Sequence, residues 1–119
     1  MKIHPSELYF YHSSFQPIDK QTKAYAKSLT NFVNEIDIVR EKMTATQWDQ
    51  ILKMLDLRPK DLLNRAHPEY QSKIAGKEWD EESWLNILVK FPHLIKSPIA
   101  IYRNKAILCK TPTDILKLD

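Results

Sequence analysis

The first 39 residues contain two strand-like segments separated by one helix-like segment, and this order restricts the folds open to the chain. Residues 8–11 read Leu-Tyr-Phe-Tyr, an apolar run that suits a strand buried on both faces of a sheet. Pro17 suits the first position of a helix that continues to Leu29. Residues 33–39 alternate in character, which predicts a second, partly exposed strand. Two strands joined through a helix pair in parallel, with a right-handed crossover.

The middle of the chain is predicted to be mainly helical. Thr44 and Gln47 form a capping box, and apolar side chains recur at helical spacing from residue 48 to residue 55. Pro59 begins another short helix, whereas residues 65–76 are polar and predicted to be irregular or weakly helical. Asp80 is a suitable N-cap for a further helix that ends before residue 92. On these helices Trp48 and Trp84, with Tyr25 on the first helix, are predicted to be core residues.

The last quarter of the chain predicts a β-hairpin followed by a helix. Residues 99–102 and 106–109 are short apolar runs joined by a polar turn at residues 103–105. Thr111 is suited to cap a final helix, with Pro112 first in it and Asp114 completing the cap. The predicted order therefore gives an α/β fold with a four-stranded mixed sheet and helices on both faces. At 119 residues, 1–119 is predicted to form a single domain.

Composition excludes several classes of function. A single glycine rules out a glycine-rich phosphate loop, which needs several residues free to adopt positive φ. The net charge of +3 is small and spread along the chain, so direct nucleic-acid binding is not expected. Residues 1–6 are polar and no long apolar segment follows, which predicts neither a signal peptide nor membrane association. The expected location is the cytoplasm.

Few residues offer metal or nucleophilic chemistry. One cysteine, Cys109, can form neither an internal disulfide nor a thiolate zinc site, and the four histidines lack metal-ligand spacing. No metal is therefore expected. Ser13 and Ser14 follow the first strand with only His12 as a nearby base, and a serine nucleophile also needs an orienting group. Ordinary loop hydroxyls are the favoured interpretation.

Four short segments resemble the glutaredoxin-type arsenate reductases and the related Spx regulators. Tyr-His at residues 11–12 is similar to the dipeptide that opens their active-site loop. Asp-Leu-Leu-Asn at residues 61–64 looks like their Arg-x-Leu-Leu helix, and Leu-Cys-Lys-Thr-Pro at residues 108–112 resembles the segment after their last strand. Residues 91–99, Phe-Pro-His-Leu-Ile-Lys-Ser-Pro-Ile, are similar to their His-Pro-x-Leu-Ile-x-Arg-Pro-Ile segment and form the most specific match. Together these segments extend the resemblance over nearly the whole chain.

The resemblance implies a thioredoxin-like (glutaredoxin) three-layer fold, with a helical insertion before the C-terminal hairpin. In that family a cysteine at the start of the first helix attacks arsenate, and its thiolate is stabilised by the helix terminus. Three arginines hold the oxyanion, and glutathione with glutaredoxin resolves the adduct. The Spx regulators keep the fold and use cysteine as a redox sensor on RNA polymerase. The resemblance also implies that Pro98 follows a cis peptide bond.

The sequence departs from this family pattern at each of those positions. Gln16 stands at the place of the cysteine, and an amide is not a nucleophile at neutral pH. Lys60, Ser97 and Lys110 stand at the places of the three arginines. Lysine keeps the positive charge without the planar fork of arginine, and serine loses the charge. Ser13, Ser14, Gln16, Lys60, Ser97 and Lys110 are therefore the candidates for a residual anion site, with Arg58 and Arg65 as further members of a basic patch.

Two residues have competing interpretations. Gln16 is predicted to cap the first helix rather than to bind a ligand. Cys109 is predicted to be a small buried apolar residue, the usual fate of a lone cysteine, but a lowered pKa from the adjacent Lys110 would instead make it a displaced nucleophile.

The resulting functional hypothesis is an arsenate-reductase-like protein without reductase activity, which binds a small oxyanion or an unidentified protein partner. Whether it is an enzyme is left open, with the absent cysteine arguing against. Two alternatives remain: an arsenate reductase or other oxidoreductase linked to glutathione or glutaredoxin that uses Cys109 or an external thiol, and an Spx-like transcriptional regulator. No cofactor is expected beyond glutathione.

Overall fold

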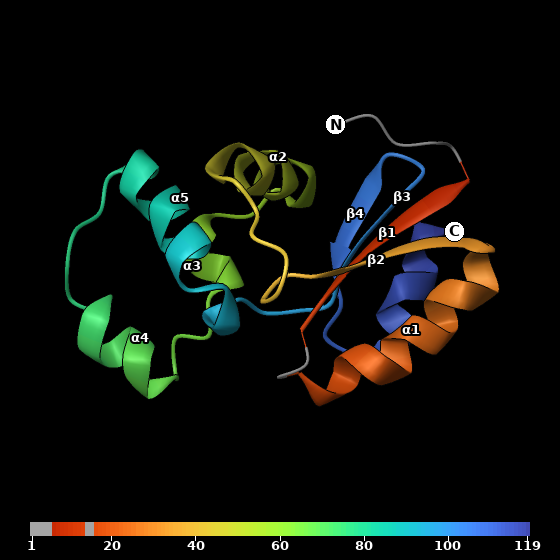
Figure 1. The fold of residues 1–119 in the computed structure, drawn as a ribbon, viewed down its shortest axis with the longest axis horizontal. Helices are drawn as coiled ribbons and strands as arrows, with labels where there is room; N and C mark the ends of the chain where they lie inside the picture. Colours follow the sequence, from red (N-terminus) through yellow and green to blue (C-terminus); the bar gives the residue numbers. More distant parts are fainter. Residues whose placement is uncertain (1–5, 14–15) are drawn as a thin grey trace.

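A computed structural model describes residues 6–13 and 16–119. The molecule is elongated, 42 × 28 × 23 Å, with the sheet in one half and the helices of the middle segment in the other (Figure 1). No helix in these two ranges is both long and apolar enough to cross a membrane.

Four strands form one mixed sheet, which confirms the predicted α/β architecture. They are β1 (Glu7–His12), β2 (Phe32–Asp37), β3 (Ile99–Tyr102) and β4 (Lys105–Leu108), in the spatial order β2-β1-β3-β4. β1 pairs in parallel with β2, whereas the β1–β3 and β3–β4 pairs are antiparallel. Tyr11 on β1 lies opposite Ile36 of β2 and Ile99 of β3. The ends of three predicted strands differ by one or two residues from the ends that the structure shows.

β2 ends two residues earlier than the sequence predicts, for a local reason. The Asp37 carboxylate accepts hydrogen bonds from the backbone N–H groups of Val39 (3.0 Å) and Arg40 (3.3 Å). This side-chain turn bends the chain away from the sheet. Ile38 still donates its N–H to the carbonyl oxygen of His12 at 2.9 Å and is fully buried.

Helix α1 (Pro17–Leu29) makes the crossover between β1 and β2. Its buried residues are Asp19, Thr22 and Ala26, at spacings of three and four. The predicted core residue Tyr25 is 38% exposed, so that prediction was wrong. The helix is turned so that a small alanine, and not the tyrosine, meets the sheet.

The middle segment forms α2 (Ala45–Leu55), α3 (Pro59–Leu62), α4 (Pro68–Lys73), α5 (Glu81–Lys90) and the 3-10 turn η1 (Pro92–Leu94). The Thr44 capping box of α2 and the Asp80 cap of α5 are confirmed. The segment predicted as irregular or weakly helical contains a regular helix, α4. His67 caps it, because its Nδ1 accepts the N–H of Glu69 at 3.1 Å.

The chain ends in η2 (Pro112–Leu118), a 3-10 helix where an ordinary helix was predicted. Asp114 accepts the backbone N–H groups of Lys110 (2.9 Å) and Thr111 (3.0 Å), as the predicted cap requires. These hydrogen bonds lower the pKa of Asp114 to about 2.

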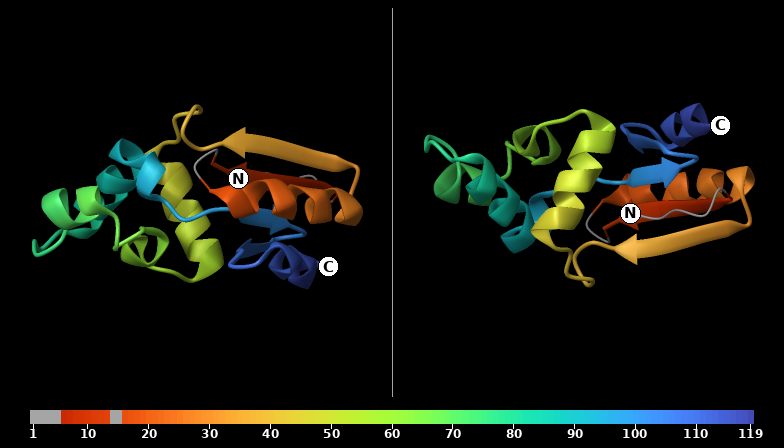
Figure 2. Two further views of the ribbon diagram at one scale, coloured as in Figure 1. Left: turned by 90° about the horizontal axis from the view of Figure 1, so that it is seen from below. Right: turned by 90° about the horizontal axis from the view of Figure 1, so that it is seen from above.

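The sheet separates two hydrophobic cores. On one face, α1 and η2 pack through Ala26, Ile115 and Leu118 against residues of β1 and β3. On the other face, Tyr11, Ile99 and Ile101 join the larger core of the helical insertion. Most of that insertion lies beyond one end of the sheet (Figure 2). Trp48 is buried in this larger core as predicted, and Trp84 is partly buried beside it.

Candidate functional site

The predicted site residues converge only in part on one cleft, named here the α1 cleft, of about 740 Å³. It lies where the start of α1, the end of β4 and the chain before β3 meet. Five residues that line it bear on function: Gln16, Arg65, Ser97, Cys109 and Lys110.

Three exposed cations line the α1 cleft, but they are not the set that the sequence predicts. Arg65 and Lys110 line it as expected, together with Lys96, which the sequence analysis did not select. Lys60 and Arg58 belong to α3 and its N-cap and do not line the cleft. These two members of the predicted basic patch are therefore not among the residues that line the cleft.

The chain before β3 is held in place by the end of α3. Leu63 and Ile95 form an isolated antiparallel bridge, and Lys96 donates its N–H to the carbonyl oxygen of Leu62 at 2.6 Å. This pairing puts Lys96 at the mouth of the cleft and Ser97 at its floor, where Ser97 is only 5% exposed. The Ser97–Pro98 peptide bond is cis.

Gln16 occupies the N-cap position of α1, at the mouth of the cleft. Its side chain makes no capping hydrogen bond, so the predicted side-chain cap was wrong. The backbone acts instead: the Gln16 carbonyl oxygen accepts the N–H of Asp19 at 3.1 Å. The side chain is therefore not committed to the helix end. Ser14 and Phe15, which precede it, lie outside the described residues.

A buried carboxylate that the sequence analysis missed lies behind this mouth. Asp19 is 4% exposed, and its Oδ2 accepts the Ser13 N–H at 2.6 Å and the Ser97 hydroxyl at 2.7 Å. Its Oδ1 is buried without a hydrogen-bond partner within the described ranges. Burial raises the pKa of Asp19, while the hydrogen bonds from Ser97 and Ser13 oppose that rise. The sequence offers only an acidic residue in a first helical turn, which is usually a surface feature.

Asp19 fixes the position of two predicted site residues. It ties the loop after β1 to the chain before β3, across 78 residues of sequence. Ser13 lines another hollow with His12, Asp19 and Lys23, which shares Gln16 with the α1 cleft. The residues of the predicted anion site are thus divided between two hollows, with Ser13 in one and the three cations in the other.

Cys109 is the only thiol of the chain, and the structure buries it. It is 3% exposed and packs in the core beneath α1 and η2. Its N–H donates to the carbonyl oxygen of Pro98 at 2.9 Å. Burial, with the negative charges of Asp114 and Asp19, raises the pKa of the thiol to about 12. The alternative in which Lys110 lowers this pKa was wrong: the lysine that lowers it is Lys117, and desolvation outweighs that charge.

Comparison with solved structures identifies the fold. The chain is similar to an arsenate reductase from Vibrio cholerae, with a TM-score of 0.87 at 14% identity, covering 98% of this chain and 100% of that one. It is similar to a candidate arsenate reductase from Yersinia pestis, with a TM-score of 0.85, 16% identity and coverage of 93% and 99%. A possible arsenate reductase from Streptococcus mutans matches with a TM-score of 0.72, 21% identity and coverage of 94% and 98%.

These matches confirm the predicted arsenate-reductase-like, thioredoxin-like fold. They extend over nearly the full length of both chains, so the helical insertion is part of the shared architecture. No family model and no curated protein matches the sequence. At such low identity, the chemistry has to be argued from the residues of this chain.

Proposed function

We propose that this arsenate-reductase-like protein binds a small oxyanion in the α1 cleft and does not reduce it. The observation that carries the proposal is the combination of an amide, Gln16, at the mouth of α1 with a single thiol buried beneath it. The solved structures of this fold include proteins named as arsenate reductases, which makes a tetrahedral oxyanion the ligand class to test first.

The thiol supports the first half of the proposal, the lack of reduction. A thiolate, not a thiol, is the nucleophile toward an oxyanion. With its pKa raised to about 12, Cys109 remains protonated at neutral pH. A glutathione-linked reaction through this residue would require it to leave the core beneath η2. The oxidoreductase alternative is therefore disfavoured, and no contact in the described residues favours a regulator over a binding protein.

The charge of the cleft supports the second half. Arg65, Lys96 and Lys110 are all exposed at its rim, and Asp61 is the one carboxylate in its lining. The Asp61 carboxylate accepts a hydrogen bond from the backbone N–H of Arg58, at 3.0 Å. None of the three cations forms an ion pair within the described part of the chain. An anion entering the cleft therefore meets unneutralised positive charge.

An assay with glutathione and glutaredoxin tests the absence of reduction. We expect no arsenate turnover above the protein-free rate, both for the natural chain and for Cys109→Ser. Turnover that disappears in Cys109→Ser would contradict the proposal, since it would require a reactive thiol. Gln16→Cys is the informative companion variant, because it restores a thiol at the mouth of α1 without altering the core.

Titration with arsenate and sulfate, followed by NMR, tests the binding site. Saturable shifts are expected at the backbone amides of Ser97 and Lys110. Arg65→Ala and Lys110→Ala should each weaken binding about twofold to fivefold, the range for one exposed charge. Lys105→Ala is the matched control, because Lys105 is an exposed lysine of β4 that does not line the cleft. If Lys105→Ala weakened binding equally, the effect would come from the net charge of the protein and not from the α1 cleft.

A further inference from the structure

A second cavity lies between α4 and α5 and shares no lining residue with the α1 cleft. This α4–α5 cavity has a volume of about 450 Å³, within the usual range for small-molecule sites. Its lining combines an apolar floor, formed by Ile74, Trp79, Ile87 and Phe91, with three lysines, Lys73, Lys77 and Lys90. No acidic residue of the described ranges lines it.

The aromatic part of the cavity is held in a fixed orientation. The indole N–H of Trp79 donates to the carbonyl oxygen of Ile74 at 3.0 Å, and its ring meets Trp84 edge-on at 6.4 Å. Phe91 is 9% exposed, at the point where α5 ends. A bound ring would therefore meet surfaces that are already ordered, and little side-chain entropy would be lost on binding.

The lysines lie over these rings. Nζ of Lys77 is 5.7 Å from the ring centre of Trp79, and Nζ of Lys90 is 5.5 Å from that of Phe91. Lys73 forms an ion pair with Glu69, at 2.9 Å, so its charge is already balanced. Lys77 and Lys90 form no ion pair with any described residue. Two unbalanced positive charges thus face a surface on which an aromatic ring can pack.

We propose that the α4–α5 cavity binds a small aromatic anion, a ring that carries a carboxylate or a phosphate. The ring would pack on Trp79 and Phe91, and the anionic group would reach Lys77 and Lys90. An inorganic anion would satisfy only the lysines, and a neutral ring only the apolar floor. The proposal is independent of the oxyanion site, because the two hollows have no residue in common.

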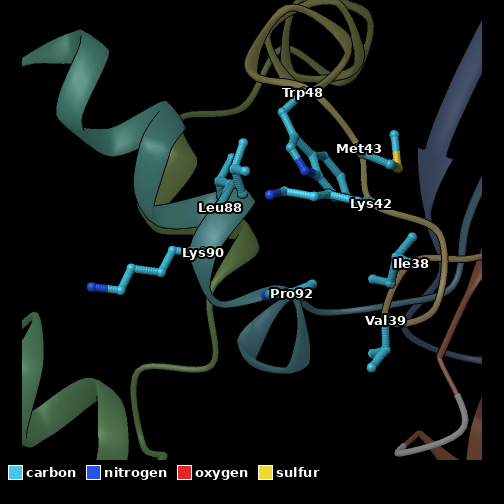
Figure 3. A pocket seen from close by; sticks show the side chains of 9 residues that line it. Ile38, Val39, Lys42, Met43, Trp48, Leu88, Lys90 and Pro92 are labelled. Atoms are coloured by element: carbon cyan, nitrogen blue, oxygen red, sulfur yellow. The ribbon is translucent and has the colours of Figure 1, made fainter.

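A neighbouring cavity of about 440 Å³ provides a matched control. It too is largely apolar, and Trp48, Met43 and Leu88 line it together with Lys42. Lys90 lines both cavities, so Lys42 is the lysine that belongs to the control cavity alone. In the close view the Lys42 side chain extends toward Leu88 (Figure 3). The Lys90 side chain points away from Lys42 and from Leu88. Lys42→Ala therefore removes a lysine beside a buried tryptophan without touching Lys77, Trp79 or Phe91.

The experiment is an NMR titration of the full chain with phenyl phosphate, inorganic phosphate and benzyl alcohol. The indole N–H signal of Trp79 is the reporter, and that of Trp48 is the internal reference. We expect phenyl phosphate to shift the Trp79 signal saturably and to bind at least about tenfold more tightly than either of the other probes, as expected when two favourable contributions act together. Lys77→Ala and Lys90→Ala should each weaken binding about twofold to fivefold.

Lys42→Ala and Lys110→Ala should leave the binding of phenyl phosphate unchanged. The proposal is overturned if the Trp79 signal does not move, if inorganic phosphate binds as tightly, or if Lys42→Ala weakens binding as much as Lys77→Ala. Loss of phenyl phosphate binding in Lys110→Ala would place the probe in the α1 cleft and would equally overturn it. Failure to bind arsenate or sulfate bears only on the α1 cleft.

Discussion

The two faces of the sheet are covered in different ways. The face toward the helical insertion belongs to a core of 17 buried residues, and the face beneath α1 and η2 belongs to a core of 8, counted over the described residues. The larger core is built from apolar and aromatic side chains. The buried polar residues Asp19 and Thr22 lie on α1, and Ser13 and Ser97 lie at the adjacent sheet end, beside the smaller core. The buried polar side chains therefore lie on the side of the smaller core.

This difference bears on function. An apolar core stabilises the fold by removing hydrocarbon from water, and a buried carboxylate works against that gain. The large core of the insertion stabilises the fold enough for the α1 side to hold Asp19, one of whose oxygens has no hydrogen-bond partner among the described residues. The thiol of Cys109 belongs to this less apolar side, whereas residues packed on both cores line the α1 cleft.

The largest expected effect is on the alkylation rate of Cys109, which is buried in the smaller core. Because the pKa of the thiol is raised from 9.0 to about 12, its thiolate fraction near pH 8 is expected to be about a thousandfold below that of a free cysteine. Alkylation by iodoacetamide should slow accordingly in the native protein and return to the free rate in urea. Mass spectrometry over time measures both rates.

If the native protein were alkylated at Cys109 nearly as fast as the protein in urea, the core beneath η2 would have to open readily. That result would contradict the contrast drawn between the two faces of the sheet. The variant Leu118→Ala provides a check. Leu118 belongs to the same core and is 3% exposed, so its truncation should loosen η2 and speed alkylation.

The next effect compares the stabilities of the two cores. Leu88→Ala removes a fully buried side chain from the larger core and should cost about 2–5 kcal/mol of unfolding free energy. Ile115→Ala, in the smaller core, should fall toward the lower end of that range, because η2 is a short 3-10 helix that can shift to fill the space. Urea unfolding followed by circular dichroism measures both. Leu116→Ala, at an exposed position, is the control.

Much of the fold could be predicted from the sequence, because its signals are local. The apolar run of β1, the Thr44 capping box and the turn before β4 each specify their own element. Positive φ at Arg103 and Asn104 completes the turn where the sequence predicts one. The region of α4 was predicted only as irregular or weakly helical, since its sequence is polar and only Tyr70 on the helix is buried.

The site was harder to predict, because its residues are brought together by pairing between distant segments. Lys96 lines the α1 cleft because the neighbouring residue Ile95 pairs with Leu63. No local sequence pattern predicts that pairing. Asp19 resembles an ordinary acidic residue in a first helical turn until Ser97 is seen to donate to it. The position of Gln16 at the N-cap was predicted correctly, because Pro17 marks the start of the helix.

A smaller effect tests whether Asp19 holds the α1 mouth together. Asp19→Ala removes the acceptor for the Ser13 N–H and the Ser97 hydroxyl and should cost about 1–3 kcal/mol. Asp19→Asn keeps an oxygen that can accept both hydrogen bonds and should cost less. Urea unfolding at neutral pH measures the two variants. An alanine variant as stable as the natural chain would mean that this network contributes nothing to stability.

The smallest effect is the pH dependence that the same residue causes. The pKa of Asp19 is raised above 3.8 in the folded state, so the folded protein holds this proton more tightly than the unfolded chain does. Its contribution is therefore most favourable below the unfolded pKa and declines as the pH rises through the folded pKa. Over that window, the slope of stability against pH should be more negative for the natural chain than for Asp19→Asn.

The Asp114 carboxylate, whose pKa is lowered to about 2, acts in the opposite direction, because its contribution is lost on acidification. Repeating the comparison in an Asp114→Asn background removes this opposing contribution, while those of Glu69 and Asp80, whose pKa values are also lowered, are the same in both proteins compared. If adding Asp19→Asn to that background then makes no difference to the slope, the Asp19 carboxylate is ionised without penalty. The α1 face would in that case be no less suited to charge than an open surface, and the contrast between the two faces of the sheet would not extend to electrostatics.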